Sequence, residues 1–249
     1  TELMLLSLSP IGLLLGPKLV QFTPSHMKIM KKVRQFRQLC HKIIADRKAQ
    51  ENKGDDLLAT LLATQKAEKP EDRMTDTDIV NEFITFFSAG MDTTARVIGM
   101  TLYMLMQHPE YLEKIKKERE ALYKVGELVD VDNVNKMEEL HCFIKETMRC
   151  YSPIPLNLDR VALQDHKIGD IDIPKGMWVK PDFFAMSFHQ KYWTEPEKFD
   201  PERWKEDAAK VDPYAYTPFS GGPRNCIGQH LAMIESKVIV SEFLEKFDV

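Results

Sequence analysis

Residues 219–228 read FSGGPRNCIG and place a single cysteine, Cys226, after a glycine-rich stretch. Gly221, Gly222 and Pro223 interrupt regular structure before the cysteine, which predicts a loop. Apolar side chains then recur at helical spacing: Ile227, Leu231, Ile234 and Val238. The pattern predicts a loop that presents Cys226 at the N-terminus of a last helix, which we expect to run from Cys226 to near Lys246.

The position predicted for Cys226 favours metal binding. Unpaired N–H groups and the dipole at a helix N-terminus favour a thiolate over a thiol. A thiolate on a glycine-rich loop is suited to be the proximal ligand of a heme iron. The alternative is an ordinary buried cysteine, the usual role of a lone cysteine at a helix start.

The spacing of residues around Cys226 resembles the heme-binding signature of the cytochrome P-450 family. The matching positions are Phe219, Gly222, Arg224, Cys226 and Gly228. The resemblance implies heme b (iron-protoporphyrin IX) with Cys226 as the iron ligand, Phe219 shielding the sulfur and Arg224 pairing with a propionate. A guanidinium forms strong, charge-assisted hydrogen bonds with a carboxylate, which explains why an arginine would stand at this position.

A long helix is predicted over residues 76–107, where apolar residues recur every three or four positions. It contains Ala89-Gly90-Met91-Asp92-Thr93-Thr94. A glycine inside a helix costs roughly 1 kcal/mol relative to alanine, and threonine hydroxyls can open a helix locally. The hexapeptide resembles the distal-helix motif of the family, which implies that Ala89 and Gly90 border the dioxygen groove and that Asp92 and Thr93 deliver protons. The alternative is a packing contact of small residues.

A second pair of motifs predicts a structural network. Glu146 and Arg149 are three residues apart in a helix expected over residues 136–151, so they share a face. The arrangement resembles the Glu-x-x-Arg helix of the family, and residues 201–204 (PERW) resemble its partner, which contributes Arg203. The resemblance implies a buried Glu146–Arg149–Arg203 triad that fixes the fold and takes no part in catalysis, because any one unpaired buried charge is costly.

Residues between these motifs are expected to line the heme and the substrate. Two prolines predict an extended path for residues 152–158, and the resemblance places Ile154, Leu156 and Leu158 in the substrate pocket. Arg160 matches a second arginine that pairs with a propionate, the alternative being an arginine on a surface strand. Two or three short strands are expected over residues 160–181, a meander over 192–212, and the cysteine loop with the last helix over 217–247.

Composition sets wider limits. The chain has 249 residues, 43% of them hydrophobic and 29% charged, which suits one large globular domain. The net charge of -4 gives no argument for nucleic acid as a partner. The apolar start, residues 3–15, is too short to span a bilayer and has no basic segment before it. The resemblance makes it a candidate for the family's loop over the substrate entrance, which often touches the membrane.

The expected fold is mainly α with a small β portion, an incomplete cytochrome P-450 fold that corresponds to the C-terminal heme-binding half of a single domain. Residues 191–204 and 212–228 look most like microsomal members of drug-metabolising family 3 and of thromboxane-synthase type. The resemblance implies an endoplasmic reticulum membrane protein, facing the cytoplasm, whose anchor lies outside this chain.

The implied function of the complete protein is monooxygenation of a small apolar molecule with dioxygen. Electrons are expected from NADPH through NADPH–cytochrome P-450 reductase, a flavoprotein, with cytochrome b5 as a further candidate donor. Two alternatives stay open: a heme-thiolate peroxide isomerase or dehydratase, and a truncated fragment without catalytic activity.

Overall fold

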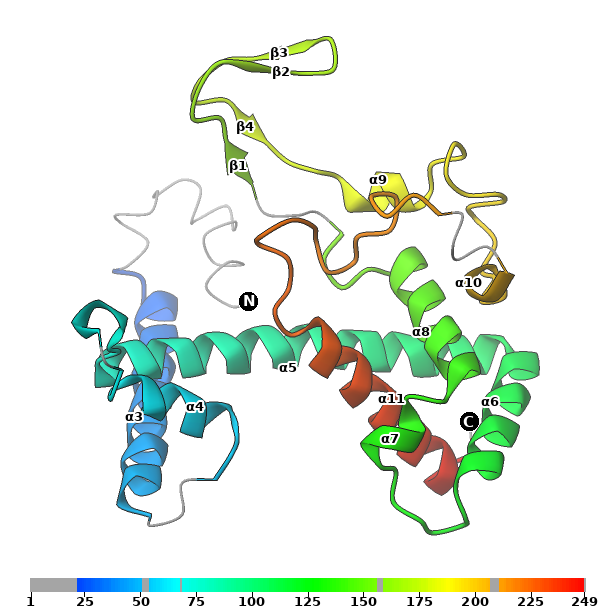
Figure 1. Ribbon diagram of the computed structural model, residues 1–249, viewed down its shortest axis with the longest axis horizontal. Coiled ribbons are helices and arrows are strands. Elements are labelled where there is room, and N and C mark those ends of the chain that lie inside the picture. The colour runs from blue at the N-terminus through cyan, green and yellow to red at the C-terminus, as the bar shows by residue number, and fades with distance from the viewer. Residues whose placement is uncertain (1–21, 51–53, 68, 156–158, 207–210, 249) are drawn as a thin grey trace. The chain divides into compact units, whose positions relative to one another are not determined.

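The structure is a computed structural model that describes residues 22–50, 54–67, 69–155, 159–206 and 211–248. The apolar start at residues 3–15 and the candidate pocket residues Leu156 and Leu158 lie outside these ranges. The chain divides into two compact units, one up to Ala89 and one from Gly90 onward. The long helix α5 (Asp76–Gln107) contributes residues to both units (Figure 1).

The first unit is helical, and its first two described α-helices each begin at a side-chain cap. Helix α3 spans Pro24–Ala49, with Thr23 accepting a hydrogen bond from the His26 N–H at 3.3 Å. Helix α4 spans Leu57–Thr64, and Asp56 accepts from the Ala59 N–H at 2.9 Å. The 3-10 turn η1 (Pro70–Asp72) leads to α5. Such caps satisfy N–H groups that have no partner inside the helix.

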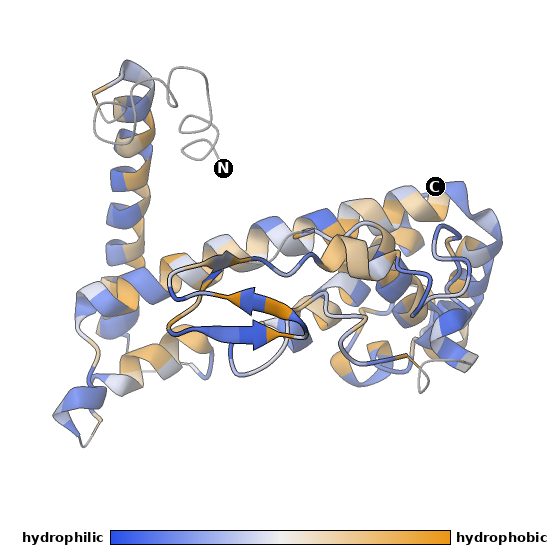
Figure 2. Ribbon diagram, turned by 90° about the horizontal axis from the view of Figure 1, so that it is seen from above, coloured by the Kyte–Doolittle hydropathy of each residue, from blue (hydrophilic) through white to orange (hydrophobic). Residues whose placement is uncertain are grey.

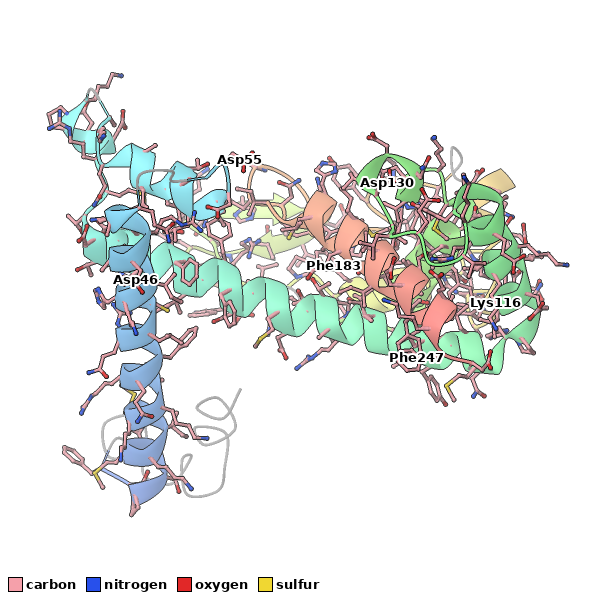
Figure 3. All side chains as sticks on the ribbon, turned by 90° about the horizontal axis from the view of Figure 1, so that it is seen from below. Asp46, Asp55, Lys116, Asp130, Phe183 and Phe247 are labelled. Carbon is pink, nitrogen blue, oxygen red and sulfur yellow. The ribbon has the colours of Figure 1, made fainter. Side chains whose placement is uncertain are left out.

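The core of this unit joins α3, α4 and the start of α5. Its buried members are Cys40, Ile44, Leu58, Leu61, Leu62, Ile79 and Val80. Figure 2 shows that hydrophilic residues alternate with hydrophobic ones along α3, and Figure 3 shows Asp46 near its carboxyl end. No helix in the described ranges is both long enough and apolar enough to cross a bilayer.

The second unit is built mainly from α5 and the helices that follow it. These are α6 (Pro109–Leu122), α7 (Val131–Val134), α8 (Glu138–Cys150), α9 (Phe183–Ser187), α10 (Arg203–Glu206) and α11 (Gln229–Lys246). Helix α11 packs against α6, α7 and α8 (Figure 3). Leu105, Ile115, Phe143, Ile144 and Val240 are fully or almost fully buried in the shared core. Burial of these large side chains stabilises the packing of α5, α6, α8 and α11.

Polar contacts fix the ends of these helices. The Glu118 carboxylate of α6 accepts hydrogen bonds from the N–H groups of Glu139 and Leu140, at 2.8 and 3.2 Å, and so caps the start of α8. Arg119, on the next position of α6, forms a largely buried ion pair with Glu245 of α11. A carboxylate at a helix N-terminus is favoured by the helix dipole.

The strands form two separate two-stranded antiparallel sheets. Strand β1 (Arg160–Val161) pairs with β4 (Trp178–Val179), and β2 (His166–Ile168) pairs with β3 (Ile171–Ile173) in the hairpin labelled in Figure 1. Gly169, with φ +59°, makes the hairpin turn. The described residues thus contain four short strands where two or three were expected. The predicted class, mainly α with a small β portion, is confirmed.

Candidate functional site

The loop that carries Cys226 is closed by its own backbone. The Cys226 N–H donates to the Phe219 carbonyl at 2.9 Å, and the Asn225 N–H donates to the Gly222 carbonyl at 3.1 Å. Gly222 has φ +80°, a conformation that favours glycine. A Cβ added there would meet no atom within 4 Å, so backbone conformation, and not crowding, explains this glycine. The loop therefore holds Cys226 at a defined place.

The Cys226 thiol is exposed, whereas Cys40, Cys142 and Cys150 are buried. Burial raises the pKa of the Cys142 and Cys150 thiols to about 11, and it also raises the pKa of Cys40. Those three thiols therefore stay protonated at neutral pH and are poor metal ligands. The alternative that Cys226 is an ordinary buried cysteine is wrong.

The prediction that the last helix begins at Cys226 is also wrong. Helix α11 begins at Gln229, with Gly228 as its N-cap residue, so the cysteine lies outside the helix. The periodic apolar residues explain the error: Ile227 and Leu231 are 82% and 68% exposed and drive no helix packing at this end. Periodicity shows which residues share a face, but the first helical residue is set by backbone hydrogen bonds such as the one from the Ala232 N–H to the Gly228 carbonyl, at 2.8 Å.

Helix α5 and the cysteine loop meet at a small cavity of about 30 Å³. Thr93 and Thr94 of α5, Phe219 of the loop and Met233 of α11 are among the residues that line it. The Thr94 side chain is buried, and Thr93 is half-buried. A cavity of this volume holds about one water molecule. The structure therefore brings Thr93 and Phe219 to the wall of one small cavity.

Asp92 does not line this cavity. Its carboxylate is exposed and pairs with Arg96, one helical turn later, at 3.1 Å. Ala89 and Gly90 are exposed as well. A Cβ added to Gly90 would meet no atom within 4 Å, so a packing contact in the described residues does not account for this glycine.

The structure brings Glu146, Arg149 and Arg203 together. Both oxygens of Glu146 accept from Arg149, at 2.9 Å each, and Oε1 also accepts from Arg203 Nε at 3.0 Å. Glu146 and Arg149 are fully buried. Arg149 also donates to the carbonyls of Ser187, Pro196 and Lys198. The network ties α8 to the segment that runs from α9 to α10.

Two further partners of Glu146 were missed from the sequence. The Trp204 indole donates to Oε2 and the Asp200 N–H donates to Oε1, both at 2.9 Å. Trp204 directly follows Arg203 in the PERW motif, and this adjacency was the available signal. The Asp200 contact comes from the backbone, which carries no sequence signal.

The remaining predicted site residues in the described ranges are exposed. Arg160 begins β1, Arg224 lies in the cysteine loop, and both are exposed. Ile154 is 48% exposed, in the segment that follows α8. An exposed thiol, two exposed guanidinium groups and open space beside Gly221 and Gly222 are the features that a heme with two propionates requires. The residues present therefore fit this cofactor.

Comparisons with known proteins agree with the motifs. The sequence model of the family described as Cytochrome P450 matches residues 3–249. The chain is 36% identical over 194 residues to cytochrome P450 3A5 of Homo sapiens, covering 77% of this chain and 38% of that protein. It is 37% identical over 177 residues to cytochrome P450 3A31 of Mesocricetus auratus, covering 71% and 35%. The chain thus spans less than half the length of these curated relatives.

A solved structure shows the same fold. The crystal structure of the cytochrome P450DA heme domain matches with a TM-score of 0.79 at 31% sequence identity. The match covers 89% of this chain and 49% of that one. The family expected from the motifs and its resemblance to family 3 are confirmed. The chain belongs to the cytochrome P450 family.

Proposed function

We propose that this chain forms the heme-binding part of a monooxygenase. The observation that carries the proposal is the exposed Cys226 thiol on a loop closed by its own hydrogen bonds, directly before α11. Cys226 would be the iron ligand, Phe219 would shield its sulfur, and Arg160 and Arg224 would pair with the propionates. When bound, heme supplies the activation of dioxygen that no protein side chain can provide.

The α5 residues would handle protons. Thr93 lines the cavity beside Phe219, so its hydroxyl can hold a proton there. Asp92 precedes it and is exposed, which lets its carboxylate exchange protons with water. We therefore assign Asp92 and Thr93 to proton delivery, with Ala89 and Gly90 on the same helix beside them.

The finer assignments rest on the family resemblance. They are a small apolar substrate that contacts Ile154, Leu156 and Leu158, electrons from NADPH through the reductase flavoprotein or cytochrome b5, and attachment to the endoplasmic reticulum membrane. Glu146, Arg149 and Arg203 would maintain the fold, because they contact one another and the backbone.

The test is the spectrum of the reduced carbon monoxide complex after the chain is reconstituted with heme. We expect the red-shifted Soret band of thiolate-ligated iron, lost in Cys226→Ala and retained in the control Cys142→Ala, which changes a buried thiol. A band that survives Cys226→Ala would overturn the ligand assignment, and no band in either protein would favour a fragment without catalytic activity. Turnover of a lipid peroxide without NADPH would favour the isomerase alternative.

A further inference from the structure

A second, larger cavity shares Met148, Pro218, Phe219 and Met233 with the first. Its volume is about 260 Å³, and it is lined by residues of α8, of the segment before Cys226 and of the start of α11. The polar groups in its wall include His141, Lys145, Ser220 and Gln229, and no carboxylate is among the lining residues. We call it the α8 cavity. A wall with several hydrogen-bond donors and no negative charge suits an anion.

Two basic side chains, His141 and Lys145, line this cavity, and the charge of Lys237 on α11 acts on the His141 ring from outside the lining. Lys145 lies over the Trp204 ring, 4.1 Å from its centroid, and Lys237 of α11 is buried with its ammonium 3.5 Å from the Val134 carbonyl. Neither lysine forms an ion pair with a carboxylate in the described part of the chain. The His141 ring has a buried Nδ1 atom without a hydrogen-bond partner there. Buried polar atoms of this kind usually have a partner.

The electrostatics of the cluster favour an added negative charge. Burial lowers the pKa of Lys145 and of Lys237, and burial together with these two charges lowers the pKa of His141 to about 4. Glu118 is the carboxylate that acts on Lys237, but it already accepts two N–H groups at the start of α8. Lys205, by contrast, pairs with both Glu139 and Glu202. Lys145 and Lys237 therefore have less neighbouring negative charge than Lys205 has.

We propose that the α8 cavity binds a small oxyanion of the phosphate class, held by His141 and Lys145 with Ser220 and Gln229 as further donors. Charge-assisted hydrogen bonds to a phosphate oxygen would satisfy the His141 ring and offset the repulsion from Lys237. Phe219, which the proposed function places beside the Cys226 sulfur, lines this cavity too, but none of the four proposed anion ligands is assigned to the heme, so phosphate binding can be tested without heme.

Binding of an anion must also raise the pKa of His141. A negative charge beside the ring favours the protonated form, so the pKa moves from about 4 toward neutral. By linkage, the anion binds more tightly as the pH falls through this range. The charged groups that act on the pKa of His141 are Lys237 on α11 and Lys145 on its own helix.

The experiment titrates inorganic phosphate into the 249-residue chain at constant ionic strength and follows heat release and the NMR signals of the histidine rings. We expect saturable binding that is weakened about tenfold in His141→Gln and in Lys145→Gln. Matched controls are His166→Gln and Lys167→Gln, because both residues are exposed in the β2–β3 hairpin. These two variants should bind phosphate as the parent chain does.

Saturable binding with these losses, accompanied by a rise in the pKa of His141 alone, would support the proposal. Absence of saturable binding would overturn it, as would equal weakening in the hairpin controls. If Lys145→Gln unfolds, as judged by near-ultraviolet circular dichroism, the proposal is tested by the pKa of the His141 ring in the parent chain with and without phosphate. A pKa of His141 that phosphate leaves unchanged would overturn the proposal.

Discussion

Glu146 and Arg203, 57 residues apart in the sequence, are joined by a hydrogen bond of 3.0 Å between Oε1 and Nε. The Glu146 side chain has no exposed surface, and that of Arg203 is 10% exposed. Because the pair is removed from water, its effect on stability is that of a buried ion network and not of a surface salt bridge.

Removing the carboxylate should be strongly destabilising. Glu146→Ala leaves the buried Arg149 guanidinium without its charge partner, and we expect the free energy of unfolding to fall by about 3–5 kcal/mol. Urea denaturation followed by tryptophan fluorescence measures the loss. The control is Glu113→Ala on the exposed face of α6, which should change the stability little. A similar small change in both variants would contradict the role assigned to Glu146.

The start of α5 should depend on one hydroxyl. Thr75 Oγ1 accepts from the Asp78 N–H at 3.2 Å, and the Asp78 carboxylate accepts from the Thr75 N–H at 2.8 Å, a reciprocal capping box. Thr75→Ala should cost about 1 kcal/mol and accelerate hydrogen exchange in the first turn of α5. Thr77→Ala, which removes an exposed threonine two positions later, is the matched control. Unchanged exchange in Thr75→Ala would contradict the prediction.

The protein should lose stability as the pH falls from about 6.5 to about 4. Burial and the charges of Lys237 and Lys145 lower the pKa of His141 from 6.5 to about 4. The unfolded chain therefore binds a proton in this window that the folded chain does not, so stability is full above the window and is lost within it. The loss stays below about 3.4 kcal/mol, the full value of the difference between the two pKa values, because solvent screens the partly exposed ring.

The measurement for His141 is the free energy of unfolding at several pH values in phosphate-free buffer. His141→Gln should remove the part of the pH dependence that this histidine contributes. His166→Gln, in the exposed hairpin, should retain it. Parallel pH profiles for His141→Gln and the parent chain would show that another group is responsible.

The four thiols should differ sharply in reactivity. A maleimide should modify Cys226 rapidly in the folded chain, because its thiol is exposed, and should modify Cys40, Cys142 and Cys150 slowly. The raised pKa of the three buried thiols reduces the thiolate that reacts. Mass spectrometry should find one label per folded chain and four after denaturation. Cys226→Ser should remove the rapid reaction, and rapid labelling that persists would contradict the exposure described.

The sequence predicted those features that depend on local pattern. Apolar residues recur at helical spacing along the whole of α5, which predicts the helix. The contact between Glu146 and Arg149 follows from their spacing of three residues in a helix. The loop around Cys226 follows from Gly221, Gly222 and Pro223. Each of these requires information from only a few neighbouring residues.

The features that the sequence left out depend on the path of distant chain. Asp200 and Trp204 reach Glu146 from 54 and 58 residues away, along a segment with little periodicity. The large cavity at His141 forms only because Tyr216 to Ser220 pass beside α8. The pairing of Asp92 with Arg96 is local, but the motif that suggested proton delivery carries no information about which partner the carboxylate selects.

The five hydrogen bonds that converge on Glu146 have a consequence for the order of folding. Two of them come from Arg149 in the same helix, and three come from residues 200–204. If α8 entered the core before that segment arrived, a carboxylate would be dehydrated with its donors incomplete, which is energetically unfavourable. Closure of this region is therefore expected to be concerted: the segment from α9 to α10 and the buried face of α8 lose their water together.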